Sequence, residues 1–141
     1  MPSRTPFNNP GAREGIYGID STHTTRDIAG AAFETIAYDI ALILSHAGRA
    51  FPVPEELHLT GGLAHNRALV QLLADVLNKT LCVFTSCDAS YGSALIARYG
   101  AEKTFLVPQP DSVATPNPAR VALYEPYVQD YIRLCQQLYS V

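Results

Sequence analysis

The segment from Leu57 to Leu77, LHLTGGLAHNRALVQLLADVL, changes its hydrophobic period half-way along its length. Its first four residues have the pattern of a short buried strand, and leucines and valines at helical spacing follow from Leu69 onward. Between them lie Gly61 and Gly62, where neither period holds. A strand that leads directly into a helix favours an α/β fold.

The rest of the chain continues this alternation of helices and strands. Apolar residues at spacings of three and four predict a helix over residues 24–47, and the run LCVFT predicts a second strand over residues 81–85. Two more helices are predicted over residues 90–99 and 119–141, the latter kinked or restarted at Pro126. The short connections imply that the two strands are parallel neighbours joined by a right-handed crossover.

Cap residues mark the predicted helix ends. Thr24, with Asp27 three residues later, resembles a capping box. Gly48 is predicted to end the first helix at a positive φ, Asn78 to end the second and Gly100 to end the third. The 141 residues are thus predicted to form one domain with four parts: a loop or approach segment (1–23), an α/β core (24–100), a Pro-rich connector (101–118) and a terminal helix (119–141).

Composition narrows the function classes. The chain is 48% hydrophobic, which is enough for a core, and its net charge of −3 with scattered Lys and Arg argues against nucleic acid as a partner. No apolar run approaches the roughly 20 residues of a spanning helix, and the N-terminus lacks the apolar core of a signal peptide. A cytoplasmic protein without a membrane partner is therefore expected. Three cysteines without a CxxC pair predict reduced thiols rather than a disulfide framework or a zinc knuckle.

The glycine pair allows two interpretations. A loop at the carboxyl end of a parallel strand exposes unpaired N–H groups and the positive end of the next helix, so Gly61 and Gly62 could let an anionic ligand approach the main chain. Asn66, placed one turn into the helix, could offer a donor and an acceptor to a base or ribose. The alternative is a tight turn with Asn66 as the helix cap, since the sequence contains neither GxxxxGK[ST] nor GxGxxG.

Five blocks of sequence, in order and with matching spacing, resemble the C-terminal part of the FGGY carbohydrate kinases. They are SRTPFNNPGAREGIYGI, STHTTRDIAGAAFETIAYDI, LTGGLAHNRALVQLLADVLNKTL, DASYGSALIARYGA and TPNPARVALYEPYVQDYIRL. Together they cover essentially the whole chain, but only the last part of the family's length. The resemblance implies a partial RNase H-like domain of the actin and hexokinase ATPase type, with short parallel strands flanked by helices.

The resemblance also implies a cofactor and a site. ATP with Mg²⁺ would be the cofactor, and Gly62 and Asn66 match family residues that contact the nucleotide, with Gly61 shaping the same turn. Adenosine would lie between this turn and the helix that contains Gly92. No catalytic residue and no metal ligand is assigned, because the family's sugar pocket and catalytic aspartate belong to a domain that this sequence does not contain.

The expected function is that of the ATP-binding C-terminal part of a kinase that transfers the γ-phosphate of ATP to a sugar or polyol hydroxyl. The chain alone is expected to bind ATP or ADP weakly and to have no kinase turnover. The alternative is a non-catalytic module of a truncated or split kinase. Such a module would act through self-association or by docking on a partner such as the missing N-terminal kinase portion.

Single residues add detail to the resemblance. Cys87 stands where the family usually has Glu, and Glu14 stands where it usually has Gly. Glu34 matches the family's helix glutamate and is expected to make a solvated or interdomain hydrogen bond. Asp20 could hold water on Mg²⁺ in an assembled site, and His65 is expected to be an exposed loop residue rather than a phosphate ligand.

Overall fold

The computed structural model describes most of the chain, in three stretches: residues 15–87, 89–104 and 108–139. They belong to two compact units, Met1–Val53 with Pro118–Val141, and Pro54–Asn117. Glu14 and the first half of the approach segment lie outside the described residues. The described remainder of that segment contains turns and bends, without a helix or strand.

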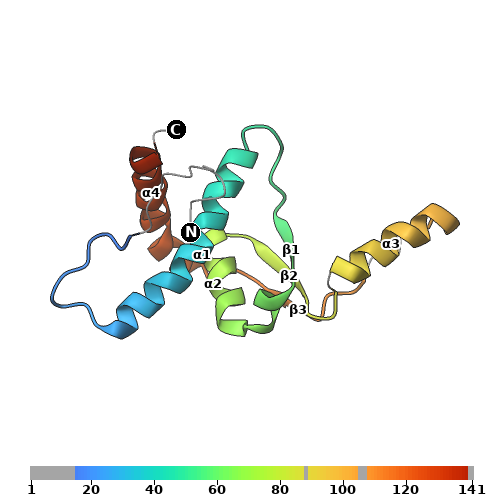
Figure 1. Cartoon of the computed structure of the whole chain (residues 1–141), viewed down its shortest axis with the longest axis horizontal. Coiled ribbons are helices and arrows are strands. Elements are labelled where there is room, and N and C mark those ends of the chain that lie inside the picture. Colours follow the sequence, from blue (N-terminus) through green and yellow to red (C-terminus); the bar gives the residue numbers. More distant parts are fainter. Residues whose placement is uncertain (1–14, 88, 105–107, 140–141) are drawn as a thin grey trace. The chain divides into compact units, whose positions relative to one another are not determined.

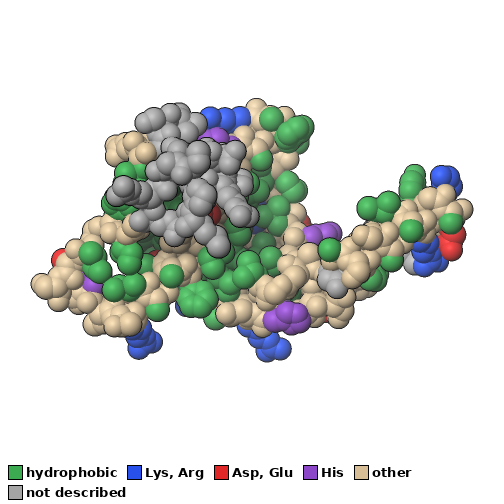
Figure 2. Space-filling model, viewed as in Figure 1, with side chains coloured by type: hydrophobic (Ala, Val, Ile, Leu, Met, Phe, Trp, Pro, Cys, Tyr) green, Lys and Arg blue, Asp and Glu red, His purple; other side chains and the backbone are tan. Residues whose placement is uncertain are grey.

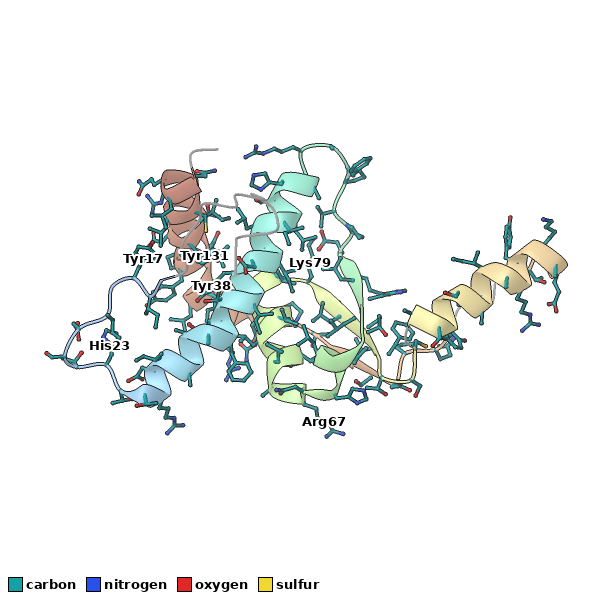
Figure 3. The ribbon with its side chains drawn as sticks, viewed as in Figure 1. Tyr17, His23, Tyr38, Arg67, Lys79 and Tyr131 are labelled. Carbon is teal, nitrogen blue, oxygen red and sulfur yellow. The ribbon has the colours of Figure 1, made fainter. Side chains whose placement is uncertain are left out.

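Two long helices make up the described core of the first unit (Figure 1). Helix α1 spans Thr25–Ala47, and α4 spans Pro118–Tyr139. The Tyr131 hydroxyl donates a hydrogen bond to Asp39 Oδ1 at 2.6 Å, and the rings of Tyr38 and Tyr131 have centroids 5.5 Å apart (Figure 3). Burial, with the hydrogen bond to Asp39 next in importance, raises the pKa of Tyr131. The hydroxyl therefore keeps its proton and fixes α4 on α1.

The observed ends of these helices agree only in part with the ends predicted from the sequence. The predicted capping box is confirmed, because Thr24 N–H donates to Asp27 Oδ2 at 2.8 Å and Asp27 N–H donates to Thr24 Oγ1 at 3.4 Å. Gly48 does follow the last residue of α1, but its φ is −61°, so the predicted positive φ is wrong. Its N–H donates to Leu44 O at 2.8 Å, which continues the helical pattern by one residue. Pro126 lies inside α4, and the helix does not restart there.

A small mixed sheet organises the second unit (Figure 1). Its strands are β1 (Glu56–Thr60), β2 (Thr80–Phe84) and β3 (Ser112–Ala114), in the order β1-β2-β3. The first two are parallel, as predicted, and β3 is antiparallel to β2. The third strand lies within residues 101–118, which the sequence predicts as a connector without a strand. At three residues, β3 is too short to produce a recognisable hydrophobic period.

Three helices complete this unit. A 3₁₀ helix, η1 (Gly62–His65), is followed by α2 (Arg67–Leu77), and α3 spans Ala89–Glu102. Asn78 ends α2 in the left-handed conformation with φ 49°, in agreement with its predicted role. Gly100 does not end α3, which continues for two more residues.

The core of the second unit lies between α2 and the sheet. Side chains alternate along β1, so Leu57 and Leu59 are half-buried while Glu56, His58 and Thr60 are exposed. Helix α2 packs against β2 and β3. The buried apolar residues that fill this region are Leu69, Val70, Leu73, Ala74 and Val76 of α2, with Leu81 and Val83 of β2.

Helix α1 is long and apolar enough to cross a membrane, by length and composition alone. The expectation that no apolar run approaches that length is therefore wrong. Length and composition alone are weak evidence for a membrane span, because core helices of folded domains share both. Only 11% of the apolar stretch of α1 is buried here. Glu34 and Asp39 of α1 accept hydrogen bonds from Tyr124 and Tyr131 of α4, which is the pairing of packed helices in a folded domain.

Asp111 fixes the beginning of β3. Its N–H donates to Val83 O at 2.8 Å, and its carboxylate accepts hydrogen bonds from the hydroxyl and the N–H of Thr85, both at 2.7 Å. These hydrogen bonds hold the pKa of Asp111 below its usual value of 3.8, and the one from the Thr85 hydroxyl contributes most. A lowered pKa means that the stabilisation is fully present above the unfolded-state pKa and is lost as the pH falls through the folded-state pKa.

We expect Thr85→Val to raise the pKa of Asp111 toward its usual value, because the hydroxyl donor is removed while the backbone donor remains. An NMR titration that follows the Asp111 carboxyl carbon measures this shift. Thr104→Val is the control, since the Thr104 hydroxyl donates to Glu102 O. An Asp111 pKa that is the same in both variants would show that the Thr85 hydroxyl does not stabilise the carboxylate.

Candidate functional site

The glycine turn, which we define as residues 61–66, leaves the carboxyl end of β1. Gly61 directly follows Thr60, and Thr60 pairs with Phe84, the last residue of β2, in the parallel register. The glycine turn and the segment that begins at Thr85 therefore leave the same edge of the sheet. In open α/β sheets this carboxyl edge is where ligands bind.

Gly61 and Gly62 have different conformational requirements. Gly61 has φ 83° and ψ −162°, a conformation that residues with a side chain rarely adopt. Gly62 begins η1 and does not have a positive φ. Apart from the adjacent residues in the chain, no heavy atom lies within 4 Å of the position that a Cβ would occupy at either glycine. The chain's own packing therefore does not require glycine at position 62, and the space beside it is open to a ligand.

Hydrogen bonds within the turn use part of its polar backbone. Ala64 N–H donates to Gly61 O, and Asn66 N–H donates to Leu63 O, both at 3.1 Å. Gly62 N–H lies at the beginning of η1, where a helix leaves its first donors without an intrahelical acceptor. This donor, together with the positive end of α2, suits an anionic or polar ligand.

Asn66 is the N-cap of α2, so its predicted place one turn inside the helix is wrong. Its Oδ1 accepts a hydrogen bond from Leu69 N–H at 3.2 Å, as the alternative interpretation of a capped turn predicts. Capping uses the amide oxygen. The group that Asn66 can offer to a ligand is therefore the Nδ2 donor, rather than a donor and an acceptor together.

Arg67 is a charged neighbour of the turn that sequence reasoning did not single out. It is the only Lys or Arg in residues 61–78, and it is exposed at the first residue of α2. Figure 3 shows its side chain extending away from the helix. His65 is also exposed, as predicted. One guanidinium neutralises only a small part of the negative charge of a triphosphate. The turn therefore suits the adenosine part of a nucleotide better than its phosphates.

Gly92, the remaining predicted site residue, lies in the first turn of α3 and is half-buried. No residue of α3 is fully buried, and Figure 2 shows apolar side chains along this helix, which include the exposed Tyr91, Ile96 and Tyr99. No packed interface between α3 and η1 or α2 is recorded in the described part of the chain. The structure therefore does not bring Gly92 against the glycine turn. Cys87, just before α3, is a half-buried free thiol.

Two carboxylates considered from the sequence have local partners. Asp20 Oδ1 accepts hydrogen bonds from the hydroxyl of Thr22 at 2.6 Å and from its N–H at 2.8 Å, and these bonds lower the pKa of Asp20. Glu34 is half-buried and accepts hydrogen bonds from the hydroxyls of Tyr38 and Tyr124, both at 3.5 Å. Glu34 does make hydrogen bonds, but it is half-buried and its partners lie in the same unit, so the predicted solvated or interdomain location is wrong.

A family model for the C-terminal domain of the FGGY family of carbohydrate kinases matches residues 2–101. This chain belongs to that family. The predicted resemblance is confirmed, and the glycine turn, α2 and most of α3 fall inside the matched range.

Relatives of this FGGY chain include kinases named for xylulose and for glycerol. It is 32% identical over 143 residues to a xylulose kinase of Escherichia coli, an alignment that covers 96% of this chain and 30% of the relative. It is 43% identical over 67 residues to a glycerol kinase of Koribacter versatilis, which covers 47% of this chain and 14% of the relative. The FGGY chain thus spans about 30% of the length of the xylulose kinase that it matches.

Solved structures show the same fold. A ligand-bound xylulose kinase from Lactobacillus acidophilus has a TM-score of 0.84 and 22% identity, over 96% of this FGGY chain and 29% of that one. A gluconate kinase from the same organism has a TM-score of 0.85 and 22% identity, with the same coverage. The predicted α/β class is confirmed.

Sequence reasoning missed Asp75, a fully buried carboxylate of this FGGY chain. Asp75 Oδ1 accepts hydrogen bonds from Gln71 Nε2 at 2.9 Å and from Asn117 N–H at 2.8 Å, and Gln71 Nε2 also donates to Thr115 O at 3.0 Å. Asp75 and Gln71 therefore connect α2 to the residues that follow β3. The available signal was an acidic residue within the apolar stripe of a predicted helix, where a charge requires partners.

Proposed function

We propose that this chain forms the adenine-nucleotide side of an ATP-dependent carbohydrate kinase. The observation that carries the proposal is the glycine turn, where Gly61 has a positive φ and Gly62 is bordered by open space at the carboxyl edge of two parallel strands. In this proposal Gly61 shapes the turn, Gly62 lets the nucleotide approach the main chain, and Asn66 donates through Nδ2. Gly92 does not pack against the turn, and in this proposal it borders the adenosine from the opposite side.

The proposed acceptor is a sugar or polyol hydroxyl, whose pocket and catalytic base lie in the part of the kinase that this chain does not span. ATP with Mg²⁺ would supply the phosphoryl group and the charge neutralisation that its transfer needs, and we assign no Mg²⁺ ligand to the described residues. Transfer also requires the nucleotide to be held in line with its acceptor. We therefore propose that the chain alone binds ATP or ADP weakly and has no kinase turnover.

An NMR titration of the ¹⁵N-labelled chain with ADP and ATP tests the site. We expect chemical-shift changes in residues 61–66, and we expect Gly62→Val to abolish them because its side chain fills the open space beside the turn. Gly30→Val is the matched control, since Gly30 of α1 also has no atom within 4 Å of its Cβ position. Equal shift changes in the two variants, or changes confined to other residues, would remove the glycine turn from the nucleotide site.

A coupled assay with xylulose, glycerol and gluconate tests the second part of the proposal. We expect no ADP production by the chain alone. Turnover of any of these compounds would contradict the proposed inactivity. It would not contradict the nucleotide site, which the NMR titration tests separately.

The second candidate function is a non-catalytic docking module. Strand β1 lies at an edge of the described sheet, and Phe51 and Ile96 are each 71% exposed. An unpaired strand edge and exposed apolar side chains favour association with another chain or a second copy. Absence of nucleotide-induced shifts, combined with a concentration-dependent mass in sedimentation experiments, would favour this function over nucleotide binding.

A further inference from the structure

Three residues with metal-binding side chains meet on the exposed face of β1. Glu56 and His58 are two residues apart, so the strand period places both side chains on the same face. Cys82 of β2 is the register partner of His58, which places its side chain on that face as well. The fold therefore gathers a carboxylate, an imidazole and a thiol at one level of the sheet.

The ligand atoms of these residues are close enough to share an ion. One carboxylate oxygen of Glu56, one ring nitrogen of His58 and the sulfur of Cys82 all lie within 4.8 Å of one another. His58 Nε2 is 3.6 Å from Glu56 Oε1, and the His58 ring is held beside the Phe84 ring with centroids 5.0 Å apart. In a tetrahedral zinc site, bond lengths near 2.0–2.3 Å place neighbouring ligand atoms roughly 3.3–3.6 Å apart. Small side-chain rotations would therefore be sufficient to bind the ion.

The donor set selects the class of metal. One sulfur, one nitrogen and one oxygen are typical of Zn²⁺ and related transition-metal ions, whereas Mg²⁺ and Ca²⁺ require mostly oxygen ligands. We propose that Glu56, His58 and Cys82 form a binding site for a zinc-like divalent cation, with water as the fourth ligand. This site is separate from the glycine turn and does not depend on the proposed nucleotide function.

The exposure of the three side chains is consistent with an open site. The side chains of Glu56 and His58 are each 58% exposed, so an ion can enter from solvent and both can rotate toward it. Cys82 is 6% exposed, so its thiol would be a ligand with little freedom to move. The pKa of its thiol is raised by its hydrogen bond to Glu56, by burial and by the negative charge of Glu56. A bound cation would counter that charge and favour release of the thiol proton.

Cobalt titration of the untagged chain tests the proposal. Co²⁺ replaces Zn²⁺ as a spectroscopic probe, and we expect one equivalent to produce a thiolate-to-cobalt charge-transfer band that Zn²⁺ abolishes and Mg²⁺ does not. His58→Gln and Glu56→Gln, both at exposed positions, are each expected to weaken binding at least about tenfold. Cys82→Ala should remove the band, and the two exposed variants keep the test informative if that buried substitution impairs folding.

Matched controls separate this site from adventitious binding. His65→Gln removes another exposed histidine of the second unit, and Cys87→Ser removes the other thiol of that unit. Both variants should bind Co²⁺ like the unmodified chain. The absence of a thiolate band would overturn the proposal. So would loss of the band in Cys87→Ser, or unchanged affinity in both His58→Gln and Glu56→Gln.

Discussion

Asp75→Ala should lower the free energy of unfolding by about 1–3 kcal/mol, because it removes a fully buried carboxylate that accepts two hydrogen bonds. The side chain of Asp75 has no exposed surface, and its Oδ1 accepts hydrogen bonds from Gln71 Nε2 and Asn117 N–H. Gln71 keeps its second acceptor, Thr115 O, whereas the Asn117 N–H loses a 2.8 Å hydrogen bond. Urea unfolding followed by circular dichroism measures the difference.

Two further variants sharpen this prediction. Asp75→Asn keeps an oxygen at the same position, so we expect a smaller loss of stability than in Asp75→Ala. Asp130→Ala removes an exposed carboxylate that pairs with Arg133 on the surface, and we expect little change. Equal stabilities of Asp75→Ala and Asp130→Ala would show that the hydrogen bonds of Asp75 do not hold α2 to the segment after β3.

Gly61→Ala should destabilise the second unit by about 1–2 kcal/mol, because a Cβ strongly disfavours a positive φ. The φ of 83° at Gly61 is set by the turn between β1 and η1, and open space around the residue does not relieve the backbone strain. Gly62→Ala meets no neighbouring atom and needs no unusual φ, so we expect a change within about 0.5 kcal/mol. The pair of variants separates backbone conformation from local space at adjacent positions.

Thermal unfolding of Gly61→Ala and Gly62→Ala checks this contrast. If both variants lose the same stability, the difference in φ between the two glycines does not control the turn. Gly62→Ala also serves the nucleotide proposal, because a variant of unchanged stability allows any loss of binding to be attributed to the site.

Much of the fold could be predicted from hydrophobic period and cap residues. The switch of period at Gly61 located both β1 and α2, and Thr24 with Asp27 located the beginning of α1. These signals are local, since each depends on residues within one or two turns. The parallel pairing of β1 with β2 also followed, because a short helix between two strands permits few other connections.

The parts that could not be predicted depend on contacts distant in sequence. Strand β3 is held by Asp111 through Val83 and Thr85, residues more than twenty positions away, and its own three residues have no distinctive period. Gly100 was expected to end α3, but glycine at a helical φ only weakens a helix and does not stop it. Gly48 shows the converse, because it ends α1 without using the positive φ that glycine allows.

The candidate site was predicted more completely in identity than in geometry. Gly61 and Gly62 occupy the expected end of β1, whereas Asn66 is a cap and the structure does not bring Gly92 to the turn. An error of about one turn in where α2 begins misplaced Asn66, since a cap and a residue inside the helix point their side chains differently. The nucleotide-binding roles of these four residues stay predictions.

Strand β3 is anchored independently at its two ends. Before it, Asp111 is bonded to Val83 and Thr85, and after it the N–H of Asn117 is bonded to Asp75. The alignment of β3 on its neighbour is consequently insensitive to how many residues separate α3 from Asp111. Evolution could insert or delete residues in that stretch without shifting the sheet, so length variation among homologous chains should concentrate there and spare the anchors.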